Sequence, residues 1–230
     1  MMLLPELVPL KSADGAQVVV QDNGIQFVRS TSVSDAAMKR AQYVIKTMIS
    51  NAPEIRARMA AARFKVEIIG RDQVISDLSD YASLRGKKTF DGRTFDNGTR
   101  GVGEKTRCSV GEENLLCLRN QRYWEEDILV HEFAHSIMSN MNADLLGALE
   151  SAYRNTVRKG LYPASIYMTA NSEEYWAEGT QAWFDATIRR DVNGGSNTRA
   201  SLKAHDPELA AVLERVYGQG QLQRMADCVY

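Results

Sequence analysis

The sequence has few cysteines and prolines and no apolar run long enough to cross a membrane. Its 230 residues include three cysteines and five prolines, and three cysteines are too few for a disulfide framework. No apolar stretch approaches the roughly 20 residues of a transmembrane helix. The formal net charge of −1 gives no reason to expect nucleic acid or an anionic membrane as a partner. What is left is an ordinary globular composition, in a chain long enough to bury one sizeable core.

The cysteine spacing carries no metal-ligand pattern. Cys108 and Cys117 flank a short segment and could close a small loop, whereas Cys228 could pair with either of them or stay free. Free thiols in a reducing cytosol are the competing interpretation. The apolar run at Met1–Pro5 lacks the basic start and the length of a secretory signal. With a disulfide such as Cys108–Cys117, the expectation is a secreted or exported protein whose signal peptide is absent from this chain, and the spacing leaves the pairing among the three cysteines open.

Histidine is equally scarce, and its placement is informative. Two of the three histidines stand in His131-Glu132-Phe133-Ala134-His135, inside an apolar run over 128–138. On a helix, positions i and i+4 share one face, so both imidazoles can reach one metal ion. Glu132 projects beside that pair, where it can act on a water molecule. This is the H-E-x-x-H pattern of zinc peptidases; a buried helix with two hydrogen-bonded histidines is the alternative.

A catalytic zinc site needs a third protein ligand, with the fourth position left for water. No histidine follows His135 at a ligand spacing, and His205 stands beside a predicted helix start. A carboxylate on a later helix is therefore the expected ligand. Glu174 and Glu178 share a helix face among aromatic neighbours, so one can bind zinc while the other accepts the second N–H of a ligating histidine. Two solvated glutamates are the competing interpretation.

Taken together, the two motifs resemble the gluzincins, zinc peptidases in which a glutamate on a downstream helix completes the site. Within them, residues 114–185 are most similar to the catalytic domain family of anthrax lethal factor. In that group a tyrosine lies seven residues before the glutamate ligand and an asparagine three residues before it, and two aromatics, Ala and Glu follow it. The matching residues here are Tyr167, Asn171, Glu174, Tyr175, Trp176, Ala177 and Glu178.

The resemblance implies a role for each of these side chains. One catalytic Zn²⁺ would be bound by His131, His135 and Glu174. Glu178 would be the hydrogen-bond partner of a ligating histidine, and Tyr167 would donate to the oxyanion of the reaction. The competing donors are Tyr162, Tyr175 and, more remotely, His205.

Hydrophobic periodicity predicts an α+β chain. Alternating segments at 17–20 and 25–28 flank an Asp-Asn-Gly turn, and 64–70 alternates as a further strand. Helical spacing covers 35–50, 53–61, 143–158, 173–188 and 207–217. We expect a zincin-like metallopeptidase fold with a small mixed or antiparallel sheet, a predominantly helical C-terminal part and an HExxH helix. One catalytic domain would span 1–230, with an N-terminal α/β part over 1–120 and a helical part carrying the zinc site over 121–230.

Two segments before the motif helix have competing interpretations. Arg85–Arg107 contains five glycines and seven basic against three acidic residues, a net charge of 7 − 3 = +4. It is either a functional rim or flap of the cleft, or a solvated surface loop. Asn114–Leu118 is predicted as a short strand, either the cleft edge that holds a peptide by main-chain hydrogen bonds or an interior strand. Residues 124–127 are expected to open the motif helix.

These features predict a hydrolase, a zinc-dependent metalloendopeptidase acting on a peptide or protein substrate with Glu132 as general base. A zinc amidase acting on a non-peptide or side-chain amide is the first alternative. A catalytically inactive zincin-fold binding module is the second, and the complete set of base and ligands argues against it. No sequence pattern defines an oligomeric state.

Overall fold

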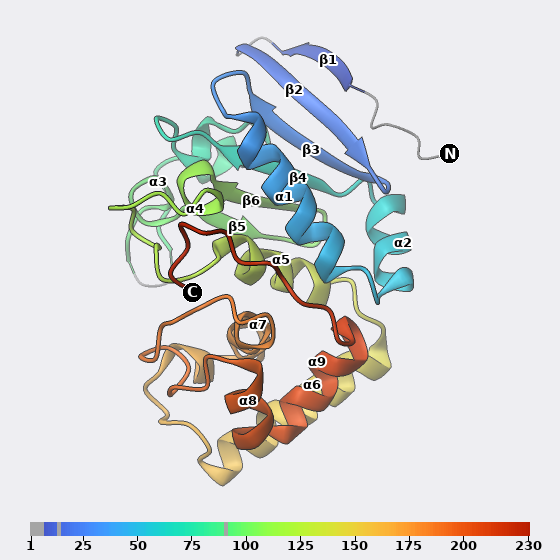
Figure 1. Ribbon diagram of the computed structural model, residues 1–230, viewed down its shortest axis with the longest axis vertical. Helices are drawn as coiled ribbons and strands as arrows, with labels where there is room; N and C mark the ends of the chain where they lie inside the picture. The colour runs from blue at the N-terminus through green and yellow to red at the C-terminus, as the bar shows by residue number, and fades with distance from the viewer. Residues whose placement is uncertain (1–6, 13–14, 90–91) are drawn as a thin grey trace.

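The computed structural model describes residues 7–12, 15–89 and 92–230, so Met1–Pro5, considered above as a signal segment, lies outside the described residues. A sheet with its covering helices forms one end of the molecule, and a group of helices forms the other (Figure 1). The motif helix α5 (Ile128–Met138) lies between the two. None of the described helices combines the length and apolarity needed to span a bilayer.

The described strands form one six-stranded mixed sheet in the order β1-β2-β3-β4-β6-β5. They are β1 (Leu7–Ser12), β2 (Gly15–Asp22), β3 (Ile25–Ser30), β4 (Lys65–Ile69), β5 (Gly101–Gly103) and β6 (Arg107–Gly111). The first three are antiparallel, β3, β4 and β6 run parallel, and β5 is antiparallel to β6. Asn23 and Gly24 close the predicted hairpin at φ values of 50° and 82°. Because β5 stands last among the described strands, one of its edges is free of strand pairing with them.

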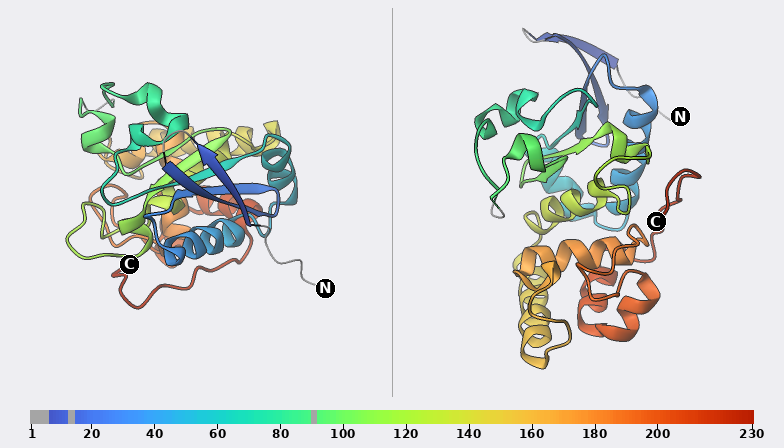
Figure 2. Two further views of the ribbon diagram at one scale, coloured as in Figure 1. Left: turned by 90° about the horizontal axis from the view of Figure 1, so that it is seen from above. Right: turned by 90° about the vertical axis from the view of Figure 1, so that its left-hand side faces the viewer.

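One face of the sheet packs on helices. Helix α1 (Asp35–Met48) and helix α2 (Pro53–Ala61) precede β4, as the sequence predicts, and Ser34 caps α1 by accepting a hydrogen bond from Ala37 N. Val66 and Ile68 of β4 are fully buried in the same apolar core as Phe133 of α5. Figure 2 shows these helices stacked against the sheet from two further sides. The motif helix is therefore held against a rigid sheet.

The opposite face of the sheet is covered by two short 3-10 helices, η1 (Ile75–Asp77) and η2 (Ser79–Leu84). Tyr81 packs there with Ile69 of β4. Glu67 also points to this side and is buried, with no hydrogen-bond partner at its Oε1 atom. Burial, together with the nearby charge of Asp80, raises the pKa of Glu67 to about 7.

Replacing Glu67 with Gln is expected to make unfolding less dependent on pH. Below about pH 4.5, its ordinary pKa, Glu67 is protonated in both the folded and the unfolded state. Between about pH 4.5 and 7 the unfolded state loses the proton first, so the folded state is destabilised as the pH rises, by about 3 kcal/mol in full. Urea unfolding of both metal-free proteins should therefore show equal stability at pH 4 and a more stable variant at pH 8. A stability difference that is the same at both pH values would contradict the assigned pKa.

The four α-helices described after α5 follow the predicted pattern with two exceptions. They are α6 (Ala143–Lys159), α7 (Ser172–Trp183), α8 (Arg199–His205) and α9 (Pro207–Tyr217). Helix α6 ends at Gly160, which has φ 62°. The prediction that α7 continues to residue 188 is wrong, because the chain turns at Asp185 and Thr187 pairs with Glu126 in an isolated β-bridge. Helix α8 was not predicted.

Two expectations about the segment before α5 are wrong. Residues 112–115 form a short helix, α4 (Glu112–Leu115), and the predicted strand over Asn114–Leu118 is absent. The Asn114 side chain explains this, because its amide donates to the Glu126 carbonyl and its oxygen accepts from Ile128 N, both at 2.8 Å. The motif helix starts at Ile128, with Asp127 as its N-cap, so residues 124–127 precede the helix and do not form its first turn.

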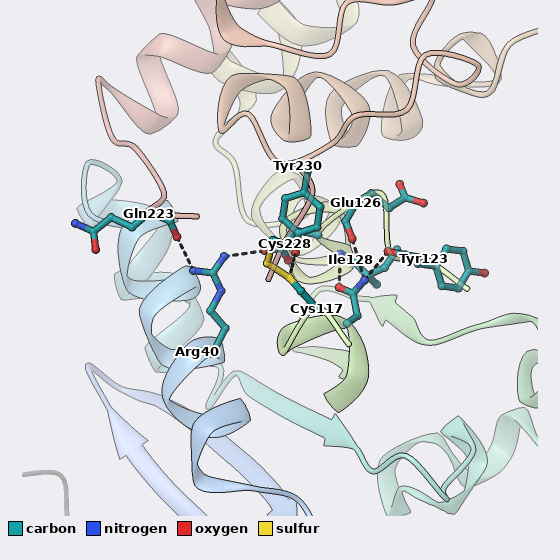
Figure 3. The surroundings of a disulfide bond; sticks show 10 residues. Arg40, Cys117, Tyr123, Glu126, Ile128, Gln223, Cys228 and Tyr230 are labelled. Atoms are coloured by element: carbon teal, nitrogen blue, oxygen red, sulfur yellow. Dashed lines mark hydrogen bonds and ion pairs between the residues drawn. A yellow bond between two sulfur atoms is a disulfide. The ribbon is translucent and has the colours of Figure 1, made fainter. Parts of the chain in front are cut away.

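Of the pairings that the sequence leaves open, the Cys108–Cys117 disulfide is wrong. Cys117 pairs with Cys228 across a separation of 111 residues (Figure 3), and Cys108 stays free. Cys108 is fully buried within β6, whereas Cys117 follows α4 on the side where the C-terminal segment returns. A disulfide remains compatible with an extracellular or otherwise oxidising location.

The C-terminal segment after α9 runs from the helical end of the molecule toward α4 (Figure 1, dark red). The carbonyl of Gln223 accepts a hydrogen bond of 2.9 Å from Arg40 of α1 (Figure 3). Arg40 also forms a buried ion pair of 3.3 Å with Asp127, the N-cap of α5. Together with the Cys117–Cys228 disulfide, these contacts hold the beginning of the motif helix in place.

Candidate metal centre

Helices α5 and α7 bring the two sequence motifs together. The indole N–H of Trp176 on α7 donates to the carbonyl of Ala134 on α5 at 2.9 Å, and both residues are fully buried. Asn171 caps α7 by accepting a hydrogen bond from Glu174 N at 2.7 Å. This cap and the indole contact hold Glu174 opposite the two motif histidines.

Within the part of the chain that the structure describes, one group of side chains could hold a metal ion, and its members are His131, His135 and Glu174. The Nε2 atoms of the two histidines are 3.3 Å apart. Oε2 of Glu174 lies 3.2 Å from Nε2 of His131 and 3.6 Å from Nε2 of His135. Oε2 of Glu174 is also buried without a hydrogen-bond partner, so three ligand atoms converge on one point.

These separations fit a zinc ion. Zinc binds imidazole nitrogen and carboxylate oxygen at about 2.0–2.2 Å in tetrahedral geometry, which places neighbouring ligand atoms about 3.3–3.5 Å apart. The three observed distances, 3.2, 3.3 and 3.6 Å, lie close to that range. Two imidazoles and one carboxylate are also a donor set of catalytic zinc sites, which leave the fourth position open.

Glu132 lies beside the three candidate ligand side chains and lines the cleft. Its Oε2 accepts a hydrogen bond of 2.8 Å from the backbone N–H of Gly103 in β5. Burial raises the pKa of Glu132 to about 7, although the adjacent His131 favours its ionised form. A carboxylate with a pKa near neutrality is suited to accept and return a proton.

Charges at the centre are strongly coupled. Burial favours the neutral form of His131, yet Glu174, Glu132 and Glu178 around it raise its pKa to about 10. Burial and the charge of His131 together lower the pKa of His135 to about 4. Burial alone would raise the pKa of Glu174, but its contact with His131 keeps that pKa below the ordinary value. In the metal-free protein, a proton on His131 balances the charge of Glu174. A metal cation bound between the same side chains would replace that proton.

Tyr167, in the 3-10 helix η3 (Tyr167–Thr169), lines the cleft with the three candidate ligand side chains. Its ring stacks against that of His131 at a centroid distance of 6.3 Å. Burial and the Glu174 carboxylate raise the pKa of Tyr167, so its phenol stays protonated and can donate.

The competing donors lie elsewhere. The Tyr175 hydroxyl is buried and donates to Asp206 at 2.6 Å, and the Tyr162 hydroxyl is buried near the same aspartate. His205 packs on Tyr162 and contacts the carbonyl of Leu161 at 2.8 Å. None of these three residues lines the cleft.

Glu178 is near His131 but does not contact it closely. Its Oε1 lies 3.7 Å from Nδ1 of His131, beyond hydrogen-bond distance, and its Oε2 has no partner. Burial raises the pKa of Glu178 to about 8. Oε1 of Gln181, one turn further along α7, lies closer to the same nitrogen, at 3.3 Å. The sequence offers no signal for Gln181, because a lone glutamine near the end of a helix matches no motif.

An open cleft of about 610 Å³ runs over this centre. One wall is the Arg93–Gly103 part of the basic glycine-rich segment, including β5, and the opposite wall includes Tyr167 and Val192. Two interpretations of Arg85–Arg107 were open, a rim of the cleft and a solvated surface loop. The part over Arg93–Gly103 forms a rim of the cleft. The cleft extends past Tyr123 to a second hollow bordered by Arg122 and Arg189.

Strand β5 lies at the edge of the cleft. The sequence suggests residues 114–118 for this position, and β5 occupies it instead. Arg100 and Glu104 direct their main-chain groups to β6, through Gly111 N to Arg100 O at 2.7 Å and Glu104 N to Arg107 O at 2.8 Å. In an antiparallel pair the alternate residues point the other way, so Gly101 and Gly103 turn their main-chain groups to the free edge. A Cβ on Gly103 would stand 1.9 Å from the Glu132 carbonyl oxygen. The Gly-Val-Gly pattern was a signal for this close approach.

Comparison with protein-family models and with curated proteins finds no match. Among solved structures, the chain is similar to the Pro-Pro endopeptidase PPEP-2 from Paenibacillus alvei, with 17% sequence identity and a TM-score of 0.53. The likeness covers 82% of this chain and 96% of that one. The chain therefore shares the fold of an endopeptidase, whereas membership of the lethal factor family stays a prediction.

Proposed function

We propose that this protein is a zinc-dependent endopeptidase in which His131, His135 and Glu174 bind one zinc ion. The proposal rests on three ligand atoms with the spacing of a tetrahedral zinc site, on the floor of an open cleft and beside Glu132. The fold shared with an endopeptidase supports a peptide as the substrate.

The chemistry divides between the metal and the side chains. A zinc ion supplies Lewis acidity, which lets water attack a carbonyl at neutral pH. Glu132 accepts the proton of the attacking water and then delivers it to the leaving amine. The hydrogen bond from Gly103 N holds the Glu132 carboxylate toward the cleft while it does so. Tyr167 donates to the carbonyl oxygen as that atom gains charge, a role worth about 3 kcal/mol in comparable sites.

An extended peptide fits along the free edge of β5. The N–H and C=O of Gly101 and the C=O of Gly103 point to that edge, whereas the Gly103 N–H is engaged by Glu132. Main-chain pairing of this kind holds a peptide without selecting its side chains. The neighbouring cleft walls then select among substrates.

We also propose that residues 1–230 act as one catalytic domain. Its N-terminal part, 1–120, supplies the edge strand, and its helical part, 121–230, supplies the zinc ligands. The Cys117–Cys228 disulfide supports work outside the reducing cytosol, as a secreted or exported enzyme.

The test is a cleavage screen on a peptide library, with and without added zinc, read by mass spectrometry. The library includes peptides with Pro-Pro bonds, because the structural neighbour is named for that bond. We expect zinc-dependent cleavage of internal peptide bonds. Hydrolysis of side-chain amides with every backbone bond intact would identify an amidase, and protein that binds no zinc would identify a binding module.

Replacing Gly103 with Ala is expected to lower kcat/KM by at least about 10-fold while zinc stays bound. The new methyl group cannot fit against the Glu132 carbonyl, so β5 must move and Glu132 loses its backbone hydrogen bond. Overpacking of this kind also costs about 1–3 kcal/mol of stability. Urea unfolding and steady-state kinetics measure both effects.

Gly147→Ala is the matched control for this variant. Apart from the adjacent residues and the backbone of its own helix, no described atom lies within 4 Å of a Cβ at Gly147. Alanine is also favoured over glycine inside a helix such as α6 by up to about 1 kcal/mol. We expect this control to keep full activity and equal or higher stability. Full activity of the Gly103 variant would contradict the proposed role of β5 in holding Glu132.

A further inference from the structure

Gln181 lies on the face of α7 that carries Glu174 and Glu178. The three positions are spaced by four and then three residues, so they follow one another along the side of the helix that meets α5. Gln181 is fully buried. A buried amide must find its partners within the protein, because leaving one unpaired costs about 1–3 kcal/mol.

The partners of Gln181 determine which way its amide points. Nε2 lies 3.2 Å from the carbonyl oxygen of Asp127 and 3.3 Å from Oε2 of Glu126. Both are acceptors, so the atom between them is the N–H₂ group. The amide oxygen therefore faces Nδ1 of His131 at 3.3 Å.

This orientation in turn determines the tautomer of His131. An amide oxygen only accepts hydrogen bonds, so Nδ1 of His131 must carry the proton that it donates. In the neutral ring the lone pair is then on Nε2. Nε2 is the atom 3.3 Å from Nε2 of His135 and 3.2 Å from Glu174, which is the position of a metal ligand.

Glu178, which the family resemblance assigns to this role, is placed less well. Its Oε1 lies 3.7 Å from Nδ1 of His131, beyond hydrogen-bond distance. Gln181 is also tied to the start of α5 through Asp127, four residues before His131. One side chain thus holds the ligand ring and the helix that carries it.

We infer that Gln181 is the positioning residue of the zinc centre, holding His131 with Nδ1 protonated and Nε2 free to bind the metal. The inference rests on the proposed zinc site. Outer partners of metal-bound histidines typically change metal affinity by about 10–100-fold. We expect an effect of that size from Gln181 and a smaller one from Glu178.

The experiment compares the wild type with Gln181→Met and Glu178→Gln. Methionine keeps the length of the side chain but offers no strong acceptor. Zinc dissociation constants are measured by chelator competition on the metal alone, with no substrate present. Gln181→Met should weaken zinc binding by about 10–100-fold, and Glu178→Gln by less than about 3-fold.

A second readout needs no variant that has to fold. ¹⁵N spectra of the zinc-loaded wild type distinguish a protonated imidazole nitrogen from a metal-bound one, and three histidines keep the spectrum simple. We expect a protonated Nδ1 on His131 with a slowly exchanging proton. Metal bound through Nδ1 would overturn the inference.

The outcomes separate the two proposals. Wild-type protein that binds no zinc would overturn the proposed function, and the role of Gln181 with it. Tight zinc binding by both the wild type and Gln181→Met would overturn the role of Gln181 alone. Weaker binding in Glu178→Gln than in Gln181→Met would return that role to Glu178.

Discussion

Glu132→Gln is expected to keep zinc bound and to lower kcat/KM by about 10²–10⁴-fold, the usual contribution of a general base. The amide is nearly isosteric with the carboxylate but cannot accept the proton of the attacking water. The oxygen of the new amide can still accept the backbone hydrogen bond from Gly103, so β5 and the cleft should keep their positions. Zinc content by metal analysis and peptide hydrolysis under steady-state conditions measure the two effects separately.

The control for this variant is Glu125→Gln. Glu125 borders the second hollow and is not among the residues that line the cleft over the proposed zinc ligands. Its replacement should leave zinc content and hydrolysis close to those of the wild type. Near-normal turnover in Glu132→Gln would rule out Glu132 as the base, and loss of zinc from it would show that the residue also supports the metal.

Glu174→Gln should weaken zinc binding by more than about 100-fold, beyond the effect of losing an outer hydrogen-bond partner. It removes the charged ligand and leaves two histidines, which do not make a stable catalytic site. Activity should disappear at low zinc concentration. The variant should also lose the stabilisation of the fold by zinc. In the wild type this stabilisation amounts to about 2.7 kcal/mol at a zinc concentration of 100 Kd.

Thermal unfolding with and without zinc measures that loss, and Glu173→Gln is the matched control. Glu173 neighbours Glu174 on the same helix but is exposed and lies outside the cleft. The control should keep both the activity and the zinc-dependent increase in Tm. An unchanged zinc response in Glu174→Gln would exclude Glu174 as a ligand.

Local patterns predicted most of the secondary structure. The β2–β3 hairpin, α1, α2, β4, α6 and α9 all lie where the sequence placed them. Each is specified by signals within a few residues, such as the Asn23-Gly24 turn, the Ser34 cap and Gly160 at the end of α6. The spacing of His131 and His135 likewise needed only the helical period.

Where local patterns predicted the wrong structure, contacts between segments far apart in the sequence determined the observed one. Asn114–Leu118 has the composition of a strand, but the Asn114 side chain bonds to main chain 12 and 14 residues away and holds a turn instead. Cys117 lies near Cys108 in sequence, yet the returning C-terminal segment brings Cys228 to it. In both cases the deciding partner lies outside the window from which a sequence pattern is read.

The same division applies to the candidate site. The sequence by itself determined which residue types could bind zinc, because the helical period places His131 and His135 on one face and Glu174 and Glu178 on another. The choice of Glu174 between the two glutamates came from the family resemblance. Only the tertiary structure decided that β5 approaches Glu132 through Gly103 and that Gln181 lies closer to His131 than Glu178 does. The hydrogen bonds of Glu132 and His131 reach a strand and a helix far away in the chain. Such distances depend on how α5 packs against β5 and α7, and spacing within one element cannot encode that packing.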